Sequence, residues 1–153
     1  MGRSVNEKSI YLDHNATTPV DHRVLDAMLP YFQNEFGNPS SIHQFGMRAR
    51  HALDRAREQV ADLIGAEPDE IVFTSGGTEA NNMAIHGSVL ARDTSRANVV
   101  TSRIEHQSVL NPCRFLADSG HSVTFVGVDE QCGVCLDELE NAVTSNTVLV
   151  SIM

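Results

Sequence analysis

Apolar positions recur at helical spacing through the first half of the chain. This spacing predicts one helix that begins after Asp21 and ends near Gly37, and a longer helix that ends at Gly65. The positions that carry these predictions are Val24, Leu25, Met28, Leu29 and Phe32 in the first helix, and Ala49, Ala52, Leu53, Ala56, Val60, Leu63 and Ile64 in the second. Ahead of both helices, residues 9–12 form a short extended candidate that is closed by turn-forming residues.

From residue 70 onward the pattern changes to short apolar runs that are separated by helical stretches. The runs are continuous and not alternating, as in strands that are buried on both faces. Strands are predicted at 71–74, 98–101, 122–126 and 147–152, and helices at 78–91, 107–118 and 136–143. This order predicts an α/β fold in which a three-layer, mostly parallel sheet carries helices on both faces.

Length, charge and hydropathy restrict the function. A chain of 153 residues, 41% of them hydrophobic, can build one core of moderate size. Its 11 Lys+Arg against 20 Asp+Glu leave a net charge of -9, which repels nucleic acids and anionic lipid surfaces. No apolar run reaches the length of a spanning helix, and the first eight residues hold no signal-peptide segment. We therefore expect a cytoplasmic protein with neither a nucleic-acid nor a membrane partner.

The sharpest local motif is the turn at residues 76–78, between the predicted strand 71–74 and the helix that follows. Glycine at Gly76 and Gly77 lets the backbone approach a bound group, and the first-turn amides with the Thr78 hydroxyl form a cup for an anion. From these residues alone, a phosphate site and a plain turn capped by Thr78 are equally open. A nucleotide P-loop is excluded, because no Gly-Lys-Ser/Thr occurs.

A second candidate, His106, follows the predicted strand 98–101. Ligands of open parallel sheets bind beyond the carboxyl ends of the strands, which is the edge that also carries the Gly77–Thr78 turn. A neutral imidazole at that edge can stack on a flat ring or move a proton. A helix cap or surface residue is the simpler reading of His106 taken alone.

Two further groups of residues have competing interpretations. Arg48, Arg50, Arg55 and Arg57 are interleaved with acidic residues, which favours an ion-paired helix surface over a phosphate patch. Cys132 and Cys135 have the spacing of a zinc or dithiol pair. Because the third cysteine, Cys113, lies on a predicted helix without a nearby histidine, incidental cysteines are favoured, and redox and metal roles stay open. No histidine spacing indicates a metal site.

Four stretches of the chain, taken in order and spacing, resemble one family. They are Tyr11-Leu12-Asp13-His14-Asn15-Ala16-Thr17-Thr18-Pro19, Phe36-Gly37-Asn38-Pro39-Ser40-Ser41-Ile42-His43, Phe73-Thr74-Ser75-Gly76-Gly77-Thr78-Glu79-Ala80-Asn81-Asn82 and Glu105-His106. With these stretches the chain resembles the cysteine desulfurases, pyridoxal-phosphate enzymes of the class V aminotransferase family.

The resemblance implies both a site and a reaction. Gly77 and Thr78 would hold the phosphate of pyridoxal 5'-phosphate, and His106 would stack on its ring and act as a catalytic proton carrier. The reaction would convert L-cysteine to L-alanine and leave a persulfide on the enzyme for iron–sulfur cluster or thio-cofactor assembly. The resemblance also implies a homodimer and contacts with sulfur-acceptor or scaffold proteins.

The resemblance implies a domain division as well. Residues 1–20 would be an N-terminal arm, and 21–153 the N-terminal portion of a pyridoxal-phosphate-binding large domain of fold type I. Because the chain stops at Met153, at the end of its most hydrophobic predicted strand, we expect it to be the front part of a longer protein.

Departures from the family bear on activity. The family commonly has Ala where this chain has Gly77, and Asn where it has His14. Pyridoxal-phosphate enzymes need a Schiff-base lysine, yet Lys8, the single Lys, lies in the polar N-terminal tail and matches no family catalytic position. The family's nucleophilic cysteine region is also unmatched, so we expect the chain to be inactive alone.

Three alternatives to a cysteine desulfurase fragment remain at this stage. The chain is compatible with a non-catalytic, regulatory fragment that binds phosphate or pyridoxal phosphate. It is also compatible with another class V member, such as a selenocysteine lyase. The third alternative is a redox or metal protein built around Cys132 and Cys135.

Overall fold

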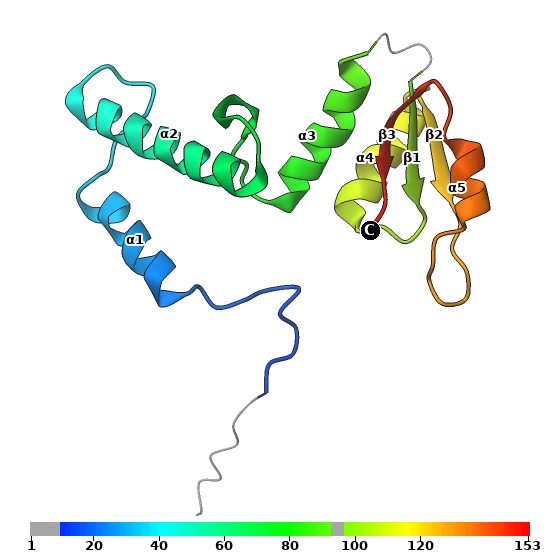
Figure 1. Cartoon of the computed structure of the whole chain (residues 1–153), viewed down its shortest axis with the longest axis horizontal. Coiled ribbons are helices and arrows are strands. Elements are labelled where there is room, and N and C mark those ends of the chain that lie inside the picture. The colour runs from blue at the N-terminus through cyan, green and yellow to red at the C-terminus, as the bar shows by residue number, and fades with distance from the viewer. Residues whose placement is uncertain (1–9, 93–96) are drawn as a thin grey trace, which may run out of the picture. The chain divides into compact units, whose positions relative to one another are not determined.

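A computed structural model describes residues 10–92 and 97–153 of the chain (Figure 1). The chain forms two compact units, one that ends at Val72 and one that begins at Phe73. Lys8 lies outside the described residues. None of the helices within the described ranges is long and apolar enough to cross a membrane.

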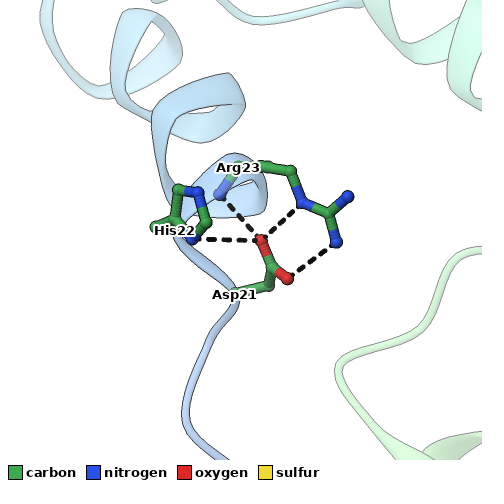
Figure 2. A network of polar contacts seen from close by, with 3 residues as sticks. All are labelled: Asp21, His22 and Arg23. Carbon is green, nitrogen blue, oxygen red and sulfur yellow. Dashed lines mark hydrogen bonds and ion pairs between the residues drawn. The ribbon is translucent and has the colours of Figure 1, made fainter.

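The first helix, α1 (His22–Gln33), begins at the predicted cap. Asp21 Oδ1 accepts the backbone N–H of Arg23 at 2.9 Å, and its carboxylate also binds the Arg23 guanidinium (Figure 2). The Arg23 side chain, and then its backbone N–H, lower the pKa of Asp21. The helix ends at Gln33, four residues before the predicted end at Gly37, because Asn34, a poor helix former, leaves helical geometry.

The second helix, α2 (Gln44–Ile64), ends as predicted at Gly65, which has the left-handed conformation that favours glycine (φ 71°). At the start of α2, the backbone of the preceding loop packs closely against the backbone of the first helical turn. A Cβ at Gly37 would overlap the carbonyl oxygen of Phe45, and a Cβ at Gly46 would overlap that of Ser41. Both positions therefore require glycine.

Ion pairs on α2 confirm part of the predicted ion-paired surface. Asp54 lies 3.3 Å from Arg57 and 4.0 Å from Arg50. Arg48 instead lies over the ring of Phe45, with 5.7 Å between its guanidinium carbon and the ring centroid.

Two predicted strands are wrong. Residues 10–12 and 71–74 belong to no strand, and residue 9 lies outside the described part of the chain. Ile71 does adopt extended backbone angles after the short 3-10 helix η1 (Pro68–Glu70). An extended segment becomes a strand only when a neighbour supplies a hydrogen-bond ladder, and no strand within the described ranges pairs with these segments.

The second unit confirms the predicted parallel α/β architecture. The strands β1 (Asn98–Ser102), β2 (Ser122–Val126) and β3 (Thr147–Ser151) form a sheet in the order β2-β1-β3, with β1 parallel to both neighbours. Helices α3 (Gly77–Leu90), α4 (Gln107–Asp118) and α5 (Leu136–Ala142) lie close to the predicted ranges.

Helices cover both faces of this sheet, with α4 on one side and α5 on the other (Figure 1). On the α3 and α4 side, Val99 of β1 packs in one core with residues of both helices; the buried members are Ile85, Val89, Ala97, Val99, Val109, Cys113 and Leu116. On the opposite side, Asn98 donates from Nδ2 to the carbonyl oxygen of Ala142 at the end of α5, at 3.1 Å. The central strand is therefore enclosed by protein on both faces.

Substitution of the central strand should cost far more than substitution of its neighbour. Val99→Ala removes two buried methyl groups from a side chain that is fully buried, so we expect the free energy of unfolding to fall by about 2 kcal/mol in urea titrations. Val150→Ala in β3, where the side chain is 43% exposed, is the matched control and should cost clearly less. Equal losses would contradict a core centred on β1.

Candidate functional site

The start of α3 differs from the starts of the other long helices of the chain. Side chains cap α1, α2 and α4, whereas no side chain caps α3 at Gly76. Within the described residues, the amides of Gly77, Thr78 and Glu79 therefore have no hydrogen-bond acceptor. Open space surrounds both Gly76 and Gly77 where a Cβ would lie. This arrangement leaves backbone donors and the positive end of the helix dipole available to an anion.

Glu79 organises the turn that leads into α3. Its carboxylate accepts the backbone N–H of Ser75 at 2.6 Å. That backbone hydrogen bond, and then one with the Ser75 side chain, lower the pKa of Glu79. The acidic side chain in the first helical turn therefore binds the preceding loop.

His106 is the N-cap of α4, which confirms the helix-cap interpretation of its position. Its Nδ1 accepts the backbone N–H of Ser108 at 3.1 Å and lies 2.8 Å from the Ser108 hydroxyl oxygen. This capping role fixes how the imidazole ring is held. It is compatible with a functional role, because His106 as a residue is exposed.

The structure brings Thr78 and His106 together. Both line one cavity of about 530 Å³ between α3 and α4. Its full lining is Thr78, Asn82, His86, His106, Gln107, Ser108, Asn111, Pro112 and Phe115. Gly77 is not among the lining residues, although it is adjacent to Thr78 in the chain. A cavity of about 640 Å³ on the α5 side contains none of the predicted site residues.

The loop that carries His106 is anchored on two sides. Arg103 donates its backbone N–H to the carbonyl oxygen of Val126 at the end of β2, at 3.0 Å. Glu105 is buried, and its Oε1 accepts the Ser102 hydroxyl at 2.8 Å and the backbone N–H of Met153 at 2.6 Å. The loop between β1 and α4 is thus joined to residues that end or follow all three strands.

The three cysteines differ in their surroundings. Cys113 is fully buried in the core, where burial and then the Glu105 carboxylate raise the pKa of its thiol. Cys132 is exposed at positive φ (63°), and Cys135 is partly buried at the start of α5. Residues 10–92 and 97–153 contain no group of three His, Cys, Asp or Glu side chains that could hold a metal ion. The zinc hypothesis for Cys132 and Cys135 therefore gains no support.

The sequence over residues 10–153 matches the aminotransferase class-V family. The chain belongs to this family. Class V aminotransferases of the cysteine desulfurase group depend on pyridoxal 5'-phosphate, so the implied cofactor is confirmed at the level of the family.

Several relatives of the class V chain are cysteine desulfurases. It is 48% identical over 147 residues to the cysteine desulfurase IscS of Dictyoglomus turgidum, covering 96% of this chain and 37% of the relative. It is 50% identical over 147 residues to the mitochondrial cysteine desulfurase of Drosophila melanogaster, covering 95% of this chain and 32% of that relative. The chain thus spans about a third of the length of these relatives.

Solved structures agree with the fold of this class V chain. A NifS-like protein superimposes with a TM-score of 0.87 at 40% identity, covering 94% of this chain and 40% of that one. A structure of SspA in complex with cysteine gives a TM-score of 0.84 at 40% identity, covering 94% and 42% of the two chains. The predicted relation to the fold of pyridoxal-phosphate enzymes is therefore confirmed.

Some residues around the cavity between α3 and α4 were not singled out by the sequence pattern. Asn81 and Ser108 contact each other at 2.8 Å beside His106, although they lie 27 positions apart in the chain. Asn81 did belong to a motif that carries the family resemblance, and Ser108 lies two positions after His106, which ends another such motif. Glu105 belonged to the same short motif, but only the packed structure shows that its side chain is buried.

Acid should weaken the turn before α3. A carboxylate whose folded-state pKa is depressed stabilises the fold above its unfolded-state pKa, and this contribution is lost as pH falls through the folded-state pKa. We therefore expect the Ser75 amide resonance to titrate with a midpoint below the ordinary glutamate value. Glu79→Gln should remove this transition, whereas Glu58→Gln on the surface of α2 should preserve it. A midpoint at the ordinary value would contradict the Ser75–Glu79 bond.

Proposed function

We propose that the chain supplies the phosphate-binding and ring-stacking portion of a cysteine desulfurase. The observation that carries this proposal is that Thr78 and His106, two residues of separate family motifs, line one cavity beside the uncapped start of α3. The relatives support the choice of reaction, because those described above are themselves cysteine desulfurases.

The residues present fit the phosphate of pyridoxal 5'-phosphate. Backbone donors at Gly77 and Thr78 without acceptors, a nearby hydroxyl and open space over two glycines match an anion of that size. Gly77 also has room for the Ala that the family commonly carries, since nothing lies within 4 Å of the added Cβ. This departure from the family therefore leaves the backbone N–H in place.

Each residue would have a separate role. Gly77 and Thr78 would bind and orient the cofactor phosphate through their N–H groups and the Thr78 hydroxyl. His106 would hold the cofactor ring by stacking and carry a proton as the catalytic residue of this portion. When bound, pyridoxal phosphate supplies an electron sink for the amino-acid carbanion.

The overall reaction would transfer one sulfur atom. L-cysteine and an enzyme thiol would give L-alanine and an enzyme persulfide, with the C–S bond of the substrate broken and an S–S bond formed. The chain's single lysine, Lys8, lies outside the described residues and in a position unlike the family's Schiff-base lysine. The reaction would therefore need the lysine and nucleophilic cysteine of the longer family proteins, and we expect this chain alone to be inactive.

The proposal extends to the domain division, the assembly and the partners. Residues 1–20 would be an arm, and 21–153 would belong to the cofactor-binding large domain. The homodimer that the family resemblance implies would cover apolar surface such as that of α1, where Phe32 is 73% exposed. A sulfur acceptor or scaffold protein would then take the persulfide. A cytoplasmic location stays a prediction, since relatives include a mitochondrial protein.

A chimera provides the direct test of this function. Residues 10–153 would replace the matching segment of the Dictyoglomus turgidum cysteine desulfurase, and alanine release from L-cysteine would be measured with the visible cofactor band. We expect an active, coloured chimera, because the segment would supply the same phosphate and ring contacts. A folded chimera that neither retains cofactor nor releases alanine would refute the proposal.

Variants of the chimera separate the roles of the two residues. His106→Ala should shift the cofactor band and reduce kcat by at least about tenfold, because it removes a stacking and proton-carrying ring. Thr78→Ala should mainly lower cofactor retention on dialysis, and Thr78→Ser, which keeps the hydroxyl, should restore it. His51→Ala, on the surface of α2, is the control for histidine loss. Unchanged spectra and kinetics in His106→Ala and Thr78→Ala would remove both residues from the site.

A further inference from the structure

A chain of three side chains ends at the imidazole of His106. Asn81 of α3 donates from Nδ2 to the hydroxyl oxygen of Ser108 at 2.8 Å. The same hydroxyl oxygen lies 2.8 Å from Nδ1 of His106. Ser108 is buried and Asn81 is partly buried, so this contact is shielded from solvent on the side of the two helices.

The direction of each hydrogen bond follows from the donors involved. The backbone N–H of Ser108 can only donate, and it points to Nδ1 of His106 at 3.1 Å. Nδ1 must therefore carry a lone pair and no proton. The Ser108 hydroxyl then has to donate to the same lone pair, while its oxygen accepts from the Asn81 amide. Both contacts at Nδ1 agree on one tautomer, in which the ring proton is on Nε2.

Protonation at Nδ1 would disrupt this arrangement. The Ser108 hydroxyl can rotate away from a new N–H, but the backbone N–H of Ser108 is fixed by the first turn of α4 and would face it directly. The helix cap would be lost at the same time, because it depends on the same lone pair. The surrounding structure thus favours the tautomer with its proton on Nε2 and a defined orientation of the ring.

We propose that Asn81 and Ser108 are positioning residues that favour the His106 tautomer with its proton on Nε2 over the one with its proton on Nδ1. This proposal deepens the proposed function and rests on it for its catalytic meaning. In this tautomer the ring offers Nε2–H as a hydrogen-bond donor, and no hydrogen bond to Nε2 is formed within residues 10–92 and 97–153. A neutral ring held at Nδ1 also presents its flat face in one orientation for stacking.

The adjacent asparagine shows that this role is specific to Asn81. Asn82 donates from Nδ2 to the carbonyl oxygen of Thr78 one helical turn earlier, at 2.8 Å, and so remains within its own helix. Within residues 10–92 and 97–153, only Asn81 of the pair forms a side-chain hydrogen bond to α4. Asn82 therefore binds the carbonyl oxygen of Thr78, and Asn81 binds Ser108 next to His106.

The test measures the tautomer of His106 in the chain itself, with no cofactor present. Long-range proton–nitrogen NMR spectra of protein with ¹⁵N-labelled histidine, recorded at a pH where the ring is neutral, distinguish protonated Nε2 from protonated Nδ1. We expect Nε2–H to dominate for His106. Asn81→Asp replaces the amide donor by a carboxylate that accepts the Ser108 hydroxyl, so that this hydroxyl no longer donates to Nδ1. The ratio of Nε2–H to Nδ1–H should fall roughly two- to tenfold, as expected for the loss of one hydrogen bond.

Matched variants separate this effect from a general loss of structure. Ser108→Ala removes the hydroxyl and keeps the backbone N–H, so it should lower the same ratio even if Asn81→Asp does not fold. Asn141→Asp on α5 and Ser88→Ala on α3 remove side-chain hydrogen bonds to their own helices and should leave the ratio unchanged. A His106 ring that is mainly Nδ1–H, or a ratio equal in the site variants and the controls, would overturn the proposal.

The result is distinguishable from that of the chimera. Loss of activity in the chimera would refute the proposed desulfurase function and would not bear on the tautomer of His106. A wrong tautomer in the NMR spectra would remove the role of Asn81 and Ser108 and leave the desulfurase function standing. In an active chimera, Asn81→Asp should lower kcat more than it changes KM, because the cofactor ring contact and not substrate binding is altered.

Discussion

The pairing of β1 with a parallel neighbour on each side is the constraint on which the second unit depends. Five consecutive residues of this strand are buried, and its register with β2 is continuous over all five. A strand enclosed in this way can place its following residues in only one position relative to the sheet. The loop from Arg103 to His106 is therefore positioned by the core and not by its own conformational preferences.

Hydrogen bonds of two residues fix this loop relative to the strands. Arg103 binds the end of β2, and Glu105 binds both Ser102 and the residue two positions after β3. A buried carboxylate that accepts two hydrogen bonds is stable only when both donors are in place. Displacement of the segment after β3 would therefore remove one of the two donors to Glu105 and destabilise the loop that carries His106.

Most helices and the parallel architecture were predictable from the sequence, because apolar periodicity and capping residues are local signals. The ranges of α4 and β2 agree with the prediction residue for residue. The predictions failed at 10–12 and 71–74, where an apolar run exists but pairing depends on a distant partner. For the site, the turn before Thr78 and the position of His106 were visible as motifs. The link from Asn81 to Ser108 was not, since it depends on how two helices pack.

The glycines of this chain differ in how freely they can change over evolutionary time. Gly37 and Gly46 each face a backbone carbonyl where a side chain would begin, so every substitution there requires the loop itself to move. Gly77 has empty space in the same direction, and exchange with alanine would keep its backbone N–H. Replacement of Gly77 by alanine is thus expected to leave the fold unchanged. Replacement of Gly37 or Gly46, which lie far from Gly77 in the chain, is expected to disrupt it. A survey of natural variants would then find the strictest glycine requirement outside the candidate site.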